Sequence, residues 1–166
     1  RALLRRVTPI QFGTDGWRAR IAEDYTEENV ARVAAASARV FGRVVRTSYA
    51  LPGDAGSVVA RRGGPSGPPV VHVGFDGRFR SEGFGEVAAR ALSSEGCRVS
   101  LATRVTPTPA LSWSVVAGRA DWGISLTASH NPGMYHGFKI RQRTGAAATP
   151  DLTAEIEKEL ERTPYE

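Results

Sequence analysis

A chain of 166 residues, 41% hydrophobic and 23% charged, has the size and composition of one globular domain with a buried core. The sequence has no apolar run long enough to span a membrane and no signal-peptide pattern, so we expect neither a membrane partner nor secretion. The single cysteine, Cys97, excludes an intrachain disulfide, argues against a cysteine-ligated metal and suits a reducing cytoplasm.

The formal net charge of +5 favours anionic partners, nucleic acid among them. The arginines are dispersed along the chain, however, and aromatic side chains do not interleave with them. A basic balance without a recognition motif is weak evidence, so a nucleic-acid-binding module is the weakest of the functions considered. The chain begins at Arg1 and not at methionine, which indicates a start inside a longer reading frame.

The N-terminal part predicts a hairpin followed by a long helix. Residues 10–13 and 17–21 are short, apolar or alternating segments on either side of a turn at Thr14-Asp15-Gly16. Thr26 is a predicted N-cap, with two glutamates in the first turn. The apolar face of the helix consists of Val30, Val33, Ala34, Ser37, Val40, Phe41 and Val44. Residues 46–69 are crowded with Gly and Pro and predict a surface loop.

Strands and helices then alternate to the end of the chain. The predicted strands or extended segments are 70–75, 98–102, 121–127 and 138–140. Ser81 is expected to cap a helix that ends at Gly96. A threonine of Thr106-Pro107-Thr108-Pro109 is expected to cap the next helix, with Pro109 at its first position, and a last helix starts at Thr149-Pro150.

This order predicts an α/β fold over residues 1–166 as a single domain. We expect a three-layer α/β/α domain with a mixed, mainly parallel sheet and an N-terminal hairpin. In such sheets, ligands bind outside the carboxyl ends of the strands, so polar residues at those ends are candidates for function.

Four polar clusters fall at predicted junctions between strands and loops: residues 14–18, 76–78 and 129–131, and Lys139. Together they offer a hydroxyl, an imidazole and cations, which suits phosphoryl transfer, because that chemistry depends on positioning and charge stabilisation. Each cluster also has a structural explanation. Asp15 could complete a turn, Asp76 and Arg78 could form a structural pair, and Lys139 could be an ordinary exposed lysine. The neighbouring Ser129 and His130 are weak evidence for a hydrolase, because a catalytic triad is defined by geometry.

Taken together, the motifs resemble the first domain of the α-D-phosphohexomutase family, which includes phosphoglucomutase/phosphomannomutase. The resemblance covers almost the whole chain apart from the Gly/Pro-rich loop. The matching segments, in the family's order and approximate spacing, are Phe12 to Arg18, Val73 to Arg78, Thr106 to Leu111, Thr127 to Pro132 and Gly137 to Lys139.

The resemblance implies a function and a set of site residues. Ser129 matches the active-site serine, which carries a phosphoryl group and exchanges it with a hexose phosphate substrate through a bisphosphate intermediate. Arg18, His130 and Lys139 match residues near the transferring group. The family holds Mg2+ with a phosphoserine oxygen, here at Ser129, and with three aspartates of an Asp-x-Asp-x-Asp motif; glucose 1,6-bisphosphate is its activator.

The sequence also departs from the family's pattern. It has no Asp-x-Asp-x-Asp motif, and His136 stands where many members have asparagine. We therefore expect the first of four domains, with domains II–IV absent and the isolated fragment inactive. The alternatives are a non-catalytic sugar-phosphate-binding domain with the same fold and, within the family, a phosphoglucosamine mutase. Trp17 and the Gly-Phe-Lys segment favour the hexose phosphate mutases.

Overall fold

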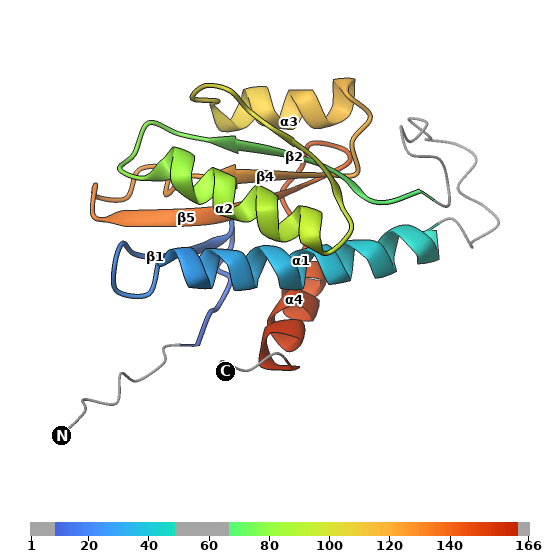
Figure 1. Ribbon diagram of the computed structural model, residues 1–166, viewed down its shortest axis with the longest axis horizontal. Coiled ribbons are helices and arrows are strands. Elements are labelled where there is room, and N and C mark those ends of the chain that lie inside the picture. Colours follow the sequence, from blue (N-terminus) through green and yellow to red (C-terminus); the bar gives the residue numbers. More distant parts are fainter. Residues whose placement is uncertain (1–8, 49–66, 163–166) are drawn as a thin grey trace.

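The computed structural model describes residues 9–48 and 67–162, which form an α/β domain (Figure 1). The strands are β1 (Trp17–Arg20), β2 (Val70–Phe75), β3 (Arg98–Leu101), β4 (Trp122–Leu126) and β5 (Tyr135–Gln142). The helices are α1 (Glu27–Ser48), α2 (Ser81–Ser94), α3 (Thr108–Ala117) and α4 (Pro150–Arg162). The predicted alternation of strands and helices is confirmed. Most of the predicted loop, residues 49–66, lies outside the described residues.

Within the described residues, the five strands form one mixed sheet in the order β1-β5-β4-β2-β3. β2 pairs in parallel with β3 and β4, whereas β5 pairs antiparallel with β4 and β1. β1, β2, β3 and β4 therefore run in the same direction, and β5 runs against them. Phe75 and Leu126, the last residues of β2 and β4, are register partners. The chain therefore leaves these two central strands at adjacent points on the same edge.

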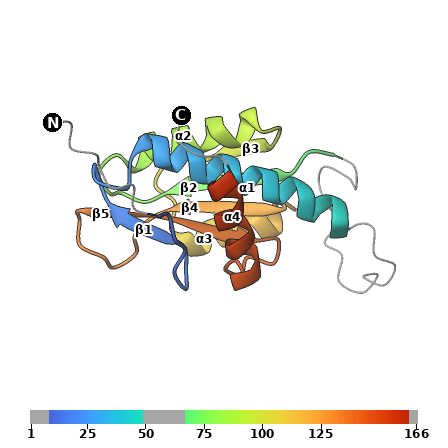
Figure 2. The same cartoon turned by 90° about the horizontal axis from the view of Figure 1, so that it is seen from below.

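The helices cover both faces of the sheet unequally. α1 packs on α2 and α4 on one face, and α3 is the only described helix on the other (Figures 1 and 2). The main core lies on the three-helix face, where Phe41 of α1 stacks on Trp122 of β4 with ring centroids 4.3 Å apart. Cys97 is buried there, and burial raises the pKa of its thiol to about 12. No helix in the described part of the chain could cross a membrane.

The predicted N-terminal hairpin is only partly present. Gly13 and Gly16 form an isolated antiparallel bridge around the predicted turn, but residues 10–12 are not a strand. The backbone N–H of Phe12 instead donates to the Glu157 carboxylate of α4, and β1 pairs with β5. The prediction of a first hairpin strand was wrong because the partner of β1 lies more than a hundred residues further along the chain.

The predicted caps have different outcomes. Thr26 caps α1, since its hydroxyl accepts the N–H of Asn29 at 3.1 Å. Ser81 does not cap α2: the N-cap position is Arg80, and the Ser81 hydroxyl is buried in contact with Asp76 and His136. No threonine caps α3 either, because its N-cap is Pro107 and Thr108 contacts Ser125 of β4 at 3.1 Å. The hydroxyls of Ser81 and Thr108 bind residues of other elements and therefore do not cap their own helices.

Candidate functional site

The connection from β4 to β5 carries the exposed serine and histidine. We call residues 127–134 the serine loop. Thr127 and Ala128 are buried, whereas Ser129 and His130 are exposed. Ser129 has a φ of 57°, in the left-handed region, which costs an L-residue roughly 1–2 kcal/mol. Its N–H donates to the Thr127 hydroxyl at 2.9 Å, so the strained residue is held by a neighbour. Backbone strain of this kind is common at functional sites.

Arg78 holds the serine loop from the end of β2. Its guanidinium donates to four backbone oxygens, those of Ser129, Asn131, Pro132 and Tyr135, at 2.8, 2.6, 3.0 and 3.1 Å. The Nε atom lies 3.2 Å from the Asp76 carboxylate. The Asp76–Arg78 pair is thus present as the structural explanation expected, but Arg78 also binds the loop that presents Ser129.

Arg18 reaches the same loop from β1. Its guanidinium donates to the Asn131 side chain at 2.7 Å, across 113 residues of sequence. Gly137, the register partner of Arg18, has no room for a side chain, because a Cβ atom there would lie 2.5 Å from the Thr127 backbone oxygen. This close backbone approach lets Arg18 reach the serine loop, and its role at a transferring phosphoryl group stays a prediction.

Lys139 lies within β5 and not at the end of a strand, which corrects the predicted placement. Its ammonium donates to the Asp15 carboxylate at 2.6 Å, and Arg141 approaches the other Asp15 oxygen at 3.2 Å. Only 5% of Lys139 is exposed, so the alternative of an ordinary surface lysine was wrong. Two buried cations share one carboxylate, which leaves this region with an excess of positive charge.

His136 is a buried polar residue to which the sequence assigned no role. It is fully buried at the start of β5, with its Nε2 atom 2.9 Å from the Ser81 hydroxyl. Burial lowers the pKa of His136, and this effect outweighs the nearby Asp76 carboxylate, which raises it. No local pattern indicated this contact, because Ser81 and His136 are 55 residues apart.

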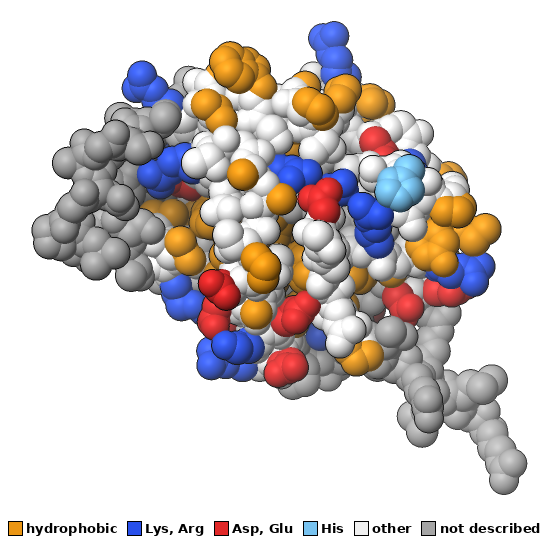
Figure 3. All heavy atoms as spheres, turned by 180° about the vertical axis from the view of Figure 1, so that it is seen from behind, with side chains coloured by type: hydrophobic (Ala, Val, Ile, Leu, Met, Phe, Trp, Pro, Cys, Tyr) orange, Lys and Arg blue, Asp and Glu red, His pale blue; other side chains and the backbone are white. Residues whose placement is uncertain are grey.

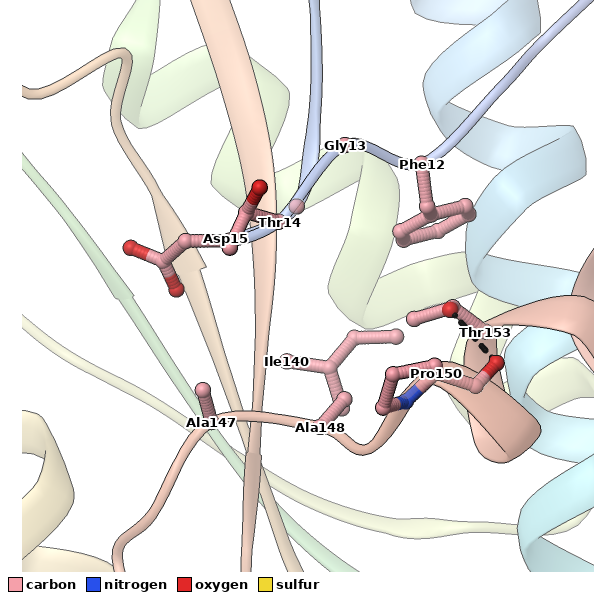
Figure 4. A pocket seen from close by; sticks show the side chains of 10 residues that line it. Phe12, Gly13, Thr14, Asp15, Ile140, Ala147, Ala148, Pro150 and Thr153 are labelled. Carbon is pink, nitrogen blue, oxygen red and sulfur yellow. Dashed lines mark hydrogen bonds between the residues drawn. The ribbon is translucent and has the colours of Figure 1, made fainter.

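Two cavities lie close to these groups. One cavity, of about 310 Å³, is lined by Phe12, Thr14, Asp15, Ile140 and Pro150, among others. In Figure 4 the Asp15 carboxylate points away from the apolar side chains of this cavity. The other, of about 620 Å³, lies at the end of β2 beside Asp76, Arg78 and Ser81. Seen from behind, Lys and Arg side chains lie close to acidic side chains, and a histidine stands at the surface (Figure 3).

The described residues contain no cluster of three or more His, Cys, Asp or Glu side chains that could hold a metal ion. Of the predicted site residues, Arg18 and Ser129 belong to one connected group through Asn131. His130 adjoins Ser129 in sequence and is exposed. Lys139 is paired with Asp15, and its role in the site stays a prediction.

Comparison with known proteins supports the family resemblance. Residues 47–166 match the family model described as phosphoglucomutase/phosphomannomutase, alpha/beta/alpha domain I. A phosphoglucosamine mutase of Frankia casuarinae is 35% identical over 91% of this chain and 29% of its own length. A phosphoglucomutase of Staphylococcus epidermidis is 36% identical over 57% of this chain and 17% of its own length.

Solved structures agree with the sequence matches. A candidate phosphomannomutase from Thermus thermophilus has a TM-score of 0.75 and 32% identity, over 92% of this chain and 30% of that one. A phosphoglucomutase/phosphomannomutase family protein from Burkholderia thailandensis has a TM-score of 0.68 and 26% identity, over 94% of this chain and 31% of that one. The chain thus spans less than a third of the length of these relatives.

The fold and the serine loop define an α/β/α domain of the phosphohexomutase class. The chain belongs to the phosphoglucomutase/phosphomannomutase family and corresponds to its domain I.

Proposed function

We propose that Ser129 carries a phosphoryl group and exchanges it with a hexose phosphate, as the serine-bearing domain of a phosphohexomutase. The observation that carries this proposal is the serine loop itself. The loop presents an exposed Ser129 in a strained conformation. Arg78 holds the backbone of the loop, and Arg18 contacts the loop at Asn131. A phosphorylated serine is close to a dianion at neutral pH, so a cation beside the loop, such as Arg18, would stabilise it.

In the proposed reaction, the bond between phosphorus and the Ser129 Oγ breaks as a sugar hydroxyl forms a new bond to phosphorus. The sugar hydroxyl gives up a proton, for which His130, adjacent to Ser129, is the proposed acceptor, and the freed Ser129 oxygen takes up a proton in exchange. The resulting bisphosphate returns its other phosphoryl group to Ser129, so phosphate moves between positions 1 and 6 of the hexose. Arg18 and Lys139 supply positive charge to the transferring group.

The family resemblance implies Mg2+, for which this chain would contribute one ligand, the phosphate on Ser129. The described residues do not form a metal site by themselves. We propose that further domains, such as those the longer relatives possess, supply the remaining ligands and the sugar-recognition groups.

The proposal covers hexose phosphates as a class. Relatives named phosphoglucomutase and relatives named phosphoglucosamine mutase both match this chain. The preference for hexose phosphates over glucosamine phosphate therefore stays a prediction, which kinetic comparison of the two substrates would test.

The first test is the location of the phosphoryl group. The protein expressed from its complete reading frame is incubated with Mg2+ and glucose 1,6-bisphosphate, and its peptides are then analysed by mass spectrometry. We expect one phosphoryl group, on Ser129, and none after incubation with glucose alone, which has no phosphate to donate. A protein that stays unmodified, or carries the group on another residue, would contradict the proposal.

The second test concerns Lys139, for which the chain offers a matched control. Lys139 and Lys158 are its only lysines, and Lys158 is exposed on α4. We expect Lys139→Met to lower kcat by about 100-fold, because it removes a charge proposed to stabilise the transition state. Lys158→Met should leave kcat within about twofold. Equal rates for the two variants in a mutase assay would remove Lys139 from the site.

A further inference from the structure

We propose that Arg78 is a positioning residue for Ser129, and that a buried chain of His136, Ser81 and Asp76 holds Arg78 in place. This inference rests on the proposed function of Ser129 as the phosphate carrier. It assigns to Arg78 no contact with substrate: the arginine acts through the backbone of the serine loop.

The hydrogen bonds of Arg78 account for its role. Each of its two terminal nitrogens donates to two carbonyl oxygens of the segment from Ser129 to Tyr135, and Nε faces Asp76. A planar guanidinium presents its donors in a rigid fork, so several carbonyl groups that converge on it are fixed relative to one another. One of them is the carbonyl of Ser129, the residue whose φ is 57°.

The partners of His136 indicate the direction of the hydrogen bonds behind Arg78. Nδ1 lies 2.9 Å from the N–H of Gly137 and 3.4 Å from the oxygen of the same residue, and the shorter contact makes Nδ1 an acceptor. A neutral imidazole then carries its proton on Nε2, which donates to the Ser81 oxygen at 2.9 Å. The Ser81 hydroxyl in turn donates to Asp76 Oδ1 at 2.9 Å. Asp76 completes the chain, since its Oδ1 accepts the backbone N–H of Arg78 and its Oδ2 faces the guanidinium.

The inner end of this chain is anchored in the core. His136 stacks on Tyr25, with ring centroids 4.8 Å apart, and meets Phe84 of α2 edge-on at 5.1 Å. Both aromatic residues are buried. The exposed serine is therefore positioned relative to the rigid interior and not only by its own loop, although the loop lies at the surface.

Precise placement matters for a phosphate carrier, because the serine oxygen must stand in line with the incoming sugar hydroxyl. A shift of about 1 Å in a reacting group can lower a rate by about 100-fold. Loss of the hydrogen bonds from Arg78 should therefore reduce the rate of transfer and leave substrate binding nearly unchanged.

The test compares Arg78→Gln with Arg80→Gln in the protein expressed from its complete reading frame. Arg80 is a suitable control because it is exposed and its guanidinium pairs with Glu27 of α1. We expect Arg78→Gln to lower kcat by about 100-fold with KM changed less than about threefold. Amide hydrogen exchange at Ser129 and Asn131 should accelerate by about tenfold or more, because the loop loses its anchor. Arg80→Gln should change neither quantity.

Two further variants test the chain behind Arg78. Ser81→Ala should act in the same direction with a smaller loss of kcat, about tenfold, since it breaks the link between His136 and Asp76. Its result is not confounded by helix capping, because Ser81 makes no capping hydrogen bond. Arg78→Lys should recover part of the lost rate, because an ammonium restores the charge without the planar fork.

The outcomes separate this inference from the proposed function. If Ser129→Ala retains the wild-type rate, the proposed function itself fails. If Ser129→Ala is inactive but Arg78→Gln keeps the wild-type kcat and slow exchange in the serine loop, only the positioning role of Arg78 is overturned. If Arg78→Gln does not fold, Ser81→Ala and Arg78→Lys decide, and wild-type kcat in both overturns the inference.

Discussion

Replacement of Ser129 by alanine is expected to lower kcat for hexose phosphate isomerisation by about 10⁴-fold or more, because it would remove the atom that we propose carries the phosphoryl group. The measurement is a steady-state assay with glucose 1-phosphate as substrate, Mg2+ and glucose 1,6-bisphosphate, on the protein expressed from its complete reading frame. Binding of the sugar phosphate should survive, because the variant loses only a hydroxyl.

The matched control is Ser100→Ala, the same change at an exposed serine of β3, the edge strand furthest from β1. Neither substitution should change the free energy of unfolding by more than about 0.5 kcal/mol, since both side chains are exposed. A Ser129→Ala variant that isomerises at a rate within tenfold of Ser100→Ala would rule out Ser129 as the phosphate carrier.

Replacement of Tyr25 by alanine is expected to have the largest effect on stability, a loss of about 3–5 kcal/mol in the free energy of unfolding. Tyr25 is fully buried, stacks on Trp17 and His136, and meets Phe84 edge-on. Its removal would leave a cavity among three rings. Denaturant unfolding of this chain, followed by circular dichroism, measures the change.

Tyr25→Phe separates the ring from the hydroxyl. The Tyr25 hydroxyl donates to the Gly137 oxygen at 2.9 Å, and this oxygen also accepts the N–H of Thr127. The acceptor thus keeps one partner in the phenylalanine variant, so the loss should be about 1 kcal/mol. A Tyr25→Ala variant as stable as Tyr25→Phe would show that the aromatic packing contributes little.

Much of the fold could be predicted because the signals for it are local. The amphipathic face of α1 and the Thr26 cap depend on residues three or four positions apart, and both are present. The apolar run of β2 predicted a strand at 70–75, and the observed bounds are the same. The one strand prediction that failed, at residues 10–13, required a choice of pairing partner, which local spacing does not contain.

The candidate site also has features that the sequence predicted and features that only the structure shows. The motif around Ser129 and the cation Arg18 were found from the sequence, and the structure connects them through Asn131. The role of Arg78 was not found, because its partners are backbone oxygens 51 to 57 residues away, which have no side-chain signature. The pairing of Lys139 with Asp15 spans 124 residues and was equally invisible.

Hydrophobic periodicity and short ordered motifs were enough to predict the class of fold, the family and the serine that the proposed chemistry needs, because these features are expressed along the chain. The contacts of the polar side chains became known only from the folded arrangement. Serine is a common helix-capping residue and Ser81 stands at the start of α2, yet its hydroxyl joins a buried histidine to the carboxylate that holds Arg78. A hydroxyl takes the partner that folding brings within hydrogen-bond distance, and in a buried network that partner is set by packing between distant segments.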